Sequence, residues 1–84
     1  MVVQLKSIFK GLIKALDEQN NKDVEEWLGK LSGYTRRELE EEVEKIKSSD
    51  RLFLEGKLTD FKVSADNRIN LIKELILDIS SYLD

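Results

Sequence analysis

The residues of this chain that are best suited to chemistry are glutamates. Five of them crowd one short segment: Glu38, Glu40, Glu41, Glu42 and Glu44. Carboxylate oxygens are the preferred ligands of hard divalent cations. A calcium site of the loop type would also need loop oxygens and a turn glycine, and this segment has a helical pattern that offers neither. We therefore interpret the glutamates as a solvated helix face.

Other residue types that carry out catalysis are missing or isolated. The 84 residues contain no His and no Cys, which removes the commonest general base and all thiolate chemistry. The serines therefore lack a histidine that could activate them, and no glycine-rich phosphate-binding loop is visible. We expect no enzymatic activity, no catalytic or metal-binding residue, no cofactor and no small-molecule substrate.

Charge is unevenly distributed along the chain. The formal net charge is −3, which disfavours nucleic-acid binding because such binding depends on Lys and Arg contacts to phosphates. The first 14 residues nevertheless contain Lys6, Lys10 and Lys14 and no acid. These lysines and a neighbouring apolar face could suit a membrane surface, but a domain this small needs that apolar face for its core. No apolar run is long enough to cross a membrane. Because the chain has no Cys, we expect a reducing, cytoplasmic location.

Apolar residues recur at steps of three and four along most of the chain, which predicts amphipathic helices. A first helix is expected over residues 2–18, weakened slightly by Gly11. A short second helix follows and ends at Leu31. Asn20 or Asn21 is expected to cap its first turn.

The segment SGYTRRE predicts a boundary between helices. Gly33 suits the left-handed conformation that often follows a helix, and Thr35 with Glu38 has the spacing of a capping box. A long third helix is expected from there until the pattern stops near Gly56. A fourth is then expected, capped by Thr59 and extending through residue 83. The prediction is one all-α domain over residues 1–84, a compact antiparallel bundle of four helices, or of five.

Two polar residues interrupt the apolar stripes of the last two predicted helices. If these helices form an antiparallel hairpin with its turn near Gly56, Asp50 faces Ala65, and Arg68 lies one turn further along. We expect Asp50 and Arg68 to pair across the hairpin, because a carboxylate in the core needs a partner. Asp66 and Asn67 are expected to point outward. The alternative is that Arg68 belongs to a binding site.

A helix-turn-helix DNA-binding motif is a further alternative for residues 24–46. The pattern has a short helix, a glycine turn and a second helix that opens with Arg36 and Arg37. The second helix then continues into glutamates, which would meet phosphate groups with like charge. This arrangement disfavours DNA binding.

In the second half of the chain a predicted helix ends near Arg51 and Gly56, and a "GKLT" turn, the triplet Asn67, Arg68 and Ile69, and a terminal helix rich in Leu and Ile follow it. In these features residues 46–83 resemble the C-terminal half of a bacterial effector-associated domain. The resemblance implies a helical domain of the death-like class without catalytic residues. It also implies an adaptor of bacterial conflict and antiviral systems, in which matching domains bring a peptidase, nuclease or TIR effector to a sensor NTPase.

From the charge distribution we expect association with a partner that carries a similar helical domain, including self-association. The basic surface would be Lys6, Lys10 and Lys14, extended by Arg36 and Arg37, and it would meet Glu40, Glu41 and Glu44 of a neighbour. Two alternatives stay open. The charged faces can be ordinary solvated surface, and the chain can be a small regulatory or structural subunit, such as an antitoxin-like inhibitor or a phage protein.

Overall fold

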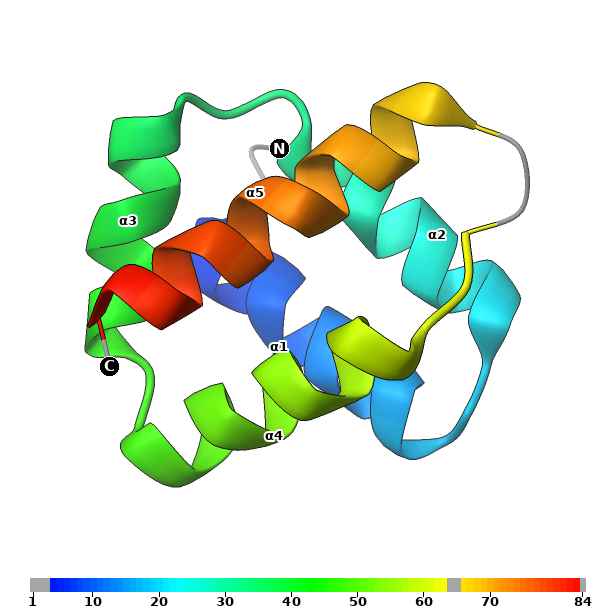
Figure 1. Ribbon diagram of the computed structural model, residues 1–84, viewed down its shortest axis with the longest axis horizontal. Helices are drawn as coiled ribbons and strands as arrows, with labels where there is room; N and C mark the ends of the chain where they lie inside the picture. The colour runs from blue at the N-terminus through cyan, green and yellow to red at the C-terminus, as the bar shows by residue number, and fades with distance from the viewer. Residues whose placement is uncertain (1–3, 64–65, 84) are drawn as a thin grey trace.

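The computed structural model describes residues 4–63 and 66–83 and contains five helices in them. They are α1 (Leu5–Asp17), α2 (Asn21–Leu31), α3 (Arg36–Lys45), α4 (Ser48–Asp60) and α5 (Asn67–Leu83). Figure 1 shows α5 crossing the front of the molecule, with α1 behind it and α4 below. The predicted all-α bundle is confirmed, and the described residues form five helices, the larger of the two expected numbers.

The core forms from the apolar faces that the helical spacing indicated. In α1 the buried residues follow steps of one, three and four, as expected for one helix face: Ile8, Phe9, Leu12, Ala15 and Leu16. Each of the other helices adds residues to the same cluster, and its centre is fully buried at Leu28, Leu39, Leu54 and Ile76. Burial of these side chains is the main source of stability in a domain without disulfides.

The predicted helix starts at Asn20 and Thr35 are confirmed. The Asn20 side chain accepts a hydrogen bond from the backbone N–H of Asp23 at 3.3 Å, which caps α2. Thr35 and Glu38 form a reciprocal capping box at the start of α3. The prediction for Gly33 is wrong, because Gln19 is the described residue with a left-handed φ, at 56°. This left-handed turn ends α1 and redirects the chain into α2.

The prediction of one long third helix is wrong, because the helix is interrupted between Lys45 and Ser48. Ile46 is extended, with φ −73° and ψ 139°, and ends α3. If α3 and α4 were joined in one straight helix over residues 36–60, it would be about 37 Å long, whereas the domain measures 30 Å along its longest axis. The break lets α3 and α4 wrap around one core.

The connection to the last helix also lies further along than expected. Gly56 is inside α4, and Thr59 does not cap a new helix. The Thr59 hydroxyl instead donates a hydrogen bond to the backbone carbonyl of Glu55 at 2.7 Å. The ammonium group of Lys73 on α5 donates to the carbonyl of Phe61 at 2.6 Å, which fastens the end of α4 to α5. The turn of the α4–α5 hairpin therefore falls within residues 61–66.

Ser80 provides a test of this packing. Its side chain is fully buried, and its hydroxyl has no hydrogen-bond partner in the described part of the chain. Because a buried polar group without a partner lowers stability, Ser80→Ala is expected to raise the free energy of unfolding by about 1 kcal/mol. Urea denaturation followed by circular dichroism measures the difference. Ser81→Ala, one residue further at an exposed position, is the control, and an equal gain in both variants would contradict the argument.

Candidate interaction surfaces

The predicted basic surface on α1 is present and open to solvent. Lys6, Lys10 and Lys14 are all exposed. Within residues 4–63 and 66–83, none of the three forms an ion pair. Their charges are therefore available to an external partner.

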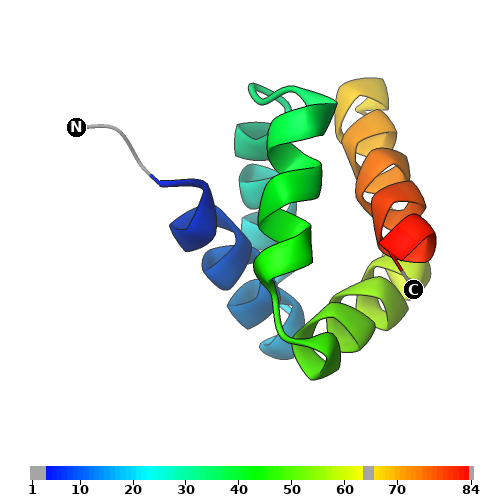
Figure 2. The same ribbon diagram turned by 90° about the vertical axis from the view of Figure 1, so that its left-hand side faces the viewer.

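Two of these lysines belong to a pocket that the sequence did not indicate. Figure 2 shows α1 and α3 side by side, with α4 beginning beneath them. Between these elements lies a pocket of about 460 Å³, hereafter the lysine pocket. Its basic residues are Lys6, Lys10, Lys45 and Lys47, its apolar residues are Phe9, Ile13 and Ile46, and its acids are Glu42 and Asp50. Lys14 lies outside it.

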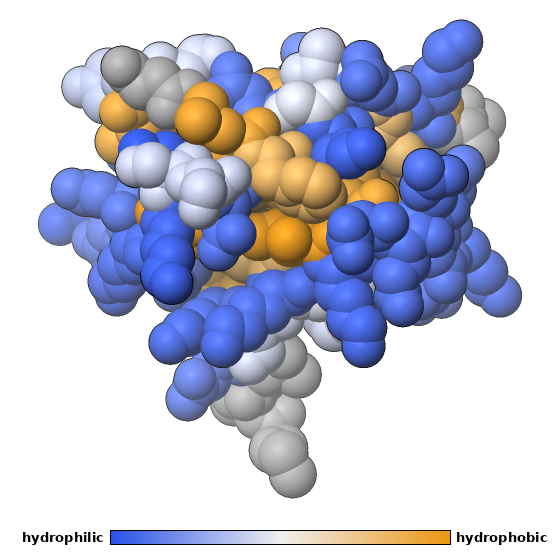
Figure 3. Space-filling model, turned by 90° about the horizontal axis from the view of Figure 1, so that it is seen from below, coloured by the Kyte–Doolittle hydropathy of each residue, from blue (hydrophilic) through white to orange (hydrophobic). Residues whose placement is uncertain are grey.

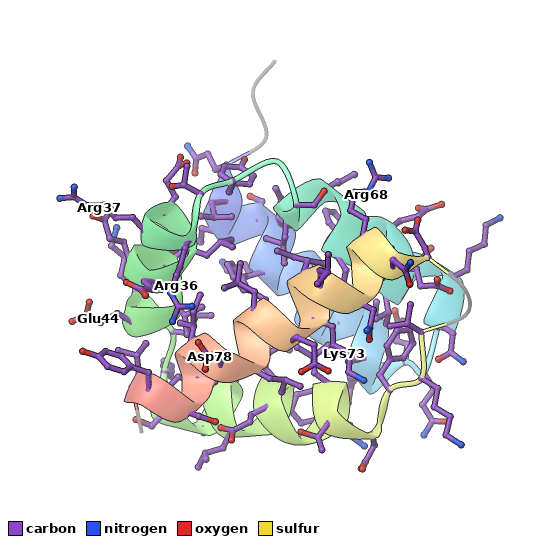
Figure 4. All side chains as sticks on the ribbon, turned by 45° about the horizontal axis from the view of Figure 1, so that its top comes forward. Arg36, Arg37, Glu44, Arg68, Lys73 and Asp78 are labelled. Atoms are coloured by element: carbon purple, nitrogen blue, oxygen red, sulfur yellow. The ribbon has the colours of Figure 1, made fainter. Side chains whose placement is uncertain are left out.

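The predicted charges on α3 are largely engaged within the molecule. Arg36 donates to Glu40 at 2.8 Å and to Asp78 of α5 at 2.7 Å. Figure 4 shows Arg36 and Asp78 pointing toward each other between the two helices. Hydrogen bonds to Glu40 and then to Asp78 raise the pKa of Arg36 above its ordinary value. Arg36 therefore joins α3 to α5, and its role in extending a basic interaction surface stays a prediction.

The rest of α3 is acidic, but part of its charge is paired within the helix. Arg37 pairs with Glu41 one turn away at 3.6 Å, an exposed contact that adds little stability. Glu44 is exposed and points away from the helix (Figure 4). Helical spacing could have predicted the pairs from Arg36 to Glu40 and from Arg37 to Glu41. Of the three predicted acids on α3, Glu44 is the one without an ion pair among the described residues.

The predicted pair of Asp50 and Arg68 is not formed. Both side chains are exposed. Asp50 lies in the first turn of α4 beside the lysine pocket. Arg68 lies in the first turn of α5, beside Lys22 and Glu26 of α2. The two first turns are at opposite ends of the α4–α5 hairpin in Figure 1.

The error in that pairing follows from the position of the turn. A turn near Gly56 would have placed Asp50 opposite the start of the last helix, whereas the turn within residues 61–66 shifts the register toward the end of α4. Ala65, the expected neighbour of Asp50, lies outside the described residues. Asp66 and Asn67 are exposed as predicted, and the Asp66 carboxylate accepts a hydrogen bond from the backbone N–H of Arg68 at 2.9 Å. Asp66 therefore supports the first turn of α5.

Exposed apolar side chains mark a second kind of surface. Leu52 on α4 is 62% exposed, and Leu71 and Tyr82 on α5 are 69% and 79% exposed. In Figure 3 apolar residues form a band across one face, with hydrophilic residues on both sides of it. Such side chains can contact a partner at little cost in desolvation.

Among the described residues, no group of three His, Cys, Asp or Glu side chains could hold a metal ion. No helix in that part of the chain is long and apolar enough to cross a membrane. No protein-family model, curated protein or solved structure matches the sequence or the fold significantly.

Proposed function

We propose that this chain is a non-catalytic adaptor domain that binds a similar helical domain on a partner protein. The observation that carries the proposal is the exposed row of Lys6, Lys10 and Lys14, none of which forms an ion pair among the described residues. A basic surface of this kind selects an acidic partner and speeds the encounter with it. The overall charge of −3 disfavours a nucleic acid as that partner.

The resemblance of residues 46–83 to bacterial effector-associated domains supplies the biological setting of the proposal. In that setting the domain recruits an effector to a sensor in a conflict or antiviral system, and both proteins act in the cytoplasm. Five amphipathic helices around one core suit this role. Such a domain presents rigid helix faces to its partners.

The helix-turn-helix alternative is disfavoured by the contacts of α3. A recognition helix must offer its first residues to base edges. Here Arg36 is held by Glu40 and Asp78, and the helix continues into glutamates. No comparable observation favours a regulatory or structural subunit.

The adaptor proposal is tested by reversing two lysine charges. The double variant Lys10→Glu, Lys14→Glu is expected to lose binding to a similar helical segment of an NTPase or peptidase encoded by a neighbouring gene. Both residues are exposed, so their replacement leaves the core intact. Affinity pull-down with the purified segment measures the loss, and circular dichroism checks that the helices are retained.

A charge-matched control makes the test specific. Lys22→Glu, Lys62→Glu changes the net charge by the same amount at two exposed positions away from the lysines of α1. Binding is expected to persist in this variant. Equal binding by the α1 variant and the wild-type chain would refute the basic surface as the interaction site.

A further inference from the structure

We propose that the lysine pocket binds the exposed α5 stripe of a second copy of this chain. The α5 stripe is defined as Leu71, Glu74, Asp78 and Tyr82. The proposal rests on the adaptor function in one respect, namely that the basic side of α1 is an interaction surface. Beyond that function, it names the pocket that is occupied, the surface of the second copy that occupies it and the kind of assembly that results.

The charge of the pocket calls for an acidic occupant. Its four lysines outnumber its two acids, so its net charge is +2. All four lysines are exposed, and within the described part of the chain none forms an ion pair. Four like charges around one hollow repel one another, and an acidic group from outside would relieve this repulsion.

The apolar floor of the pocket calls for an apolar side chain as well. Ile13 and Ile46 are half-buried beside the buried Phe9, so part of their surface still faces water. Pockets of about 300–1,000 Å³ hold compact ligands, and a volume of about 460 Å³ accommodates an aromatic ring. An aromatic anchor inside a polar rim is the arrangement typical of strong interface contacts.

The acidic face of α3 does not meet these requirements, whereas the α5 stripe does. On α3, Glu40 and Glu41 are already paired with arginines, and Glu44 brings no exposed apolar neighbour. On α5, Leu71 and Tyr82 are the most exposed large apolar side chains described, at 69% and 79%. Glu74 and Asp78 lie between them. Asp78 already pairs with Arg36 at 2.7 Å, whereas Glu74 forms no ion pair among the described residues, so Glu74 is the available acid of the stripe. Steps of three, four and four residues place all four side chains on one helix face.

The positions of the two surfaces determine the kind of assembly. Figure 2 shows α1 and α5 on opposite sides of α3. The lysine pocket is lined from α1, α3 and the start of α4, whereas the stripe belongs to α5, so the two surfaces share no residue. One copy can therefore offer its stripe to a second copy while its pocket receives the stripe of a third. Such a heterologous contact builds rings or open chains rather than closed pairs.

Sedimentation velocity over a range of concentrations tests the proposal. The wild-type chain is expected to associate as concentration rises, and less so at high salt, because salt screens the contact. Tyr82→Ala and Lys45→Glu are each expected to weaken association by about tenfold or more. Lys45→Glu combined with Glu74→Lys is expected to restore it, because the exchanged charges attract again. Lys14→Glu, on α1 but outside the pocket, is the matched control and should associate like the wild-type chain.

The outcomes separate this inference from the adaptor function. A chain that is monomeric at every concentration overturns the inference, and the adaptor function then still stands if a partner segment is bound through α1. Association that survives Tyr82→Ala and Lys45→Glu also overturns it, whichever surface carries the contact. Loss in both single variants and recovery in the charge exchange support it, since a merely unfolded variant could not be rescued by a second substitution.

Discussion

Replacing Leu54 with alanine is expected to lower the free energy of unfolding by about 2–5 kcal/mol. The same replacement at Leu52 is expected to change it by less than about 0.5 kcal/mol. The two leucines belong to the same helix, α4, two positions apart. Leu54 is fully buried in the core, whereas Leu52 is 62% exposed. The first substitution leaves a cavity among packed neighbours, and the second removes contacts mainly with water.

The size of the domain makes this difference decisive. Natural domains are stable by about 0.05–0.15 kcal/mol per residue, which for a chain of this length gives about 4–13 kcal/mol. Leu54→Ala therefore removes a large share of the total free energy of unfolding. Partial unfolding of this variant at 37 °C would agree with the prediction. Urea denaturation followed by circular dichroism measures both variants. Equal losses at the two positions would mean that α4 is rotated about its axis relative to the structure described.

Alanine substitutions at two helical glycines are expected to have opposite effects. Gly11→Ala is expected to destabilise the domain by about 1–3 kcal/mol, because the new methyl group would overlap the Cε2 and Cζ2 ring carbons of Trp27. Gly56→Ala is expected to stabilise it by up to about 1 kcal/mol, since alanine favours the helix and no atom lies within 4 Å of the new methyl group. Helix propensity alone predicts a gain at both positions. The contact between α1 and α2 reverses the sign at Gly11.

The tryptophan itself reports on this contact. Trp27 is the only tryptophan of the chain, and the ammonium group of Lys30 lies 4.3 Å from the centre of its ring. Displacement of the indole by Gly11→Ala should shift its fluorescence emission, whereas Gly56→Ala should leave the emission unchanged. Thermal unfolding gives the accompanying stabilities. A stabilised Gly11→Ala variant with native emission would show that the indole does not pack on the glycine.

Parts of the fold were predictable because their signals are local. The apolar spacing of α1 and the capping box of Thr35 with Glu38 involve residues within a few turns of each other. The break at Ile46 is not marked by glycine or proline, and its local signal is the weaker one of Ser48, Ser49 and Asp50, residue types that are common at helix starts. It follows from the need of α3 and α4 to cover one core. Gly56 indicated the end of a helix, but it lies inside α4. A glycine within a helix lowers stability by only about 1 kcal/mol, which the packing of α4 can offset.

The features of the candidate sites were likewise predictable where they depend on one helix, and not where they depend on contacts between helices. Exposure of Lys6, Lys10 and Lys14 followed from the amphipathic pattern of α1 and was correctly predicted. The lysine pocket was not, because Lys45 and Lys47 join it from a distant part of the sequence. The contact of Arg36 with Asp78 likewise spans 42 residues. Spacing within one helix indicates which residues share a face, but the position of one helix against another comes only from the folded chain.

The five helices contribute unequal numbers of buried residues to the core, so they are expected to differ in how easily they unfold locally. α1 and α5 each bury five residues, whereas α3 and α4 each bury only two within their bounds. Segments with few buried apolar contacts open locally at the lowest free energy. The end of α3 and the start of α4 form one wall of the lysine pocket. A ligand in that pocket would therefore contact the part of the domain that opens most easily. Its binding would stabilise that part and slow the exchange of its amide hydrogens.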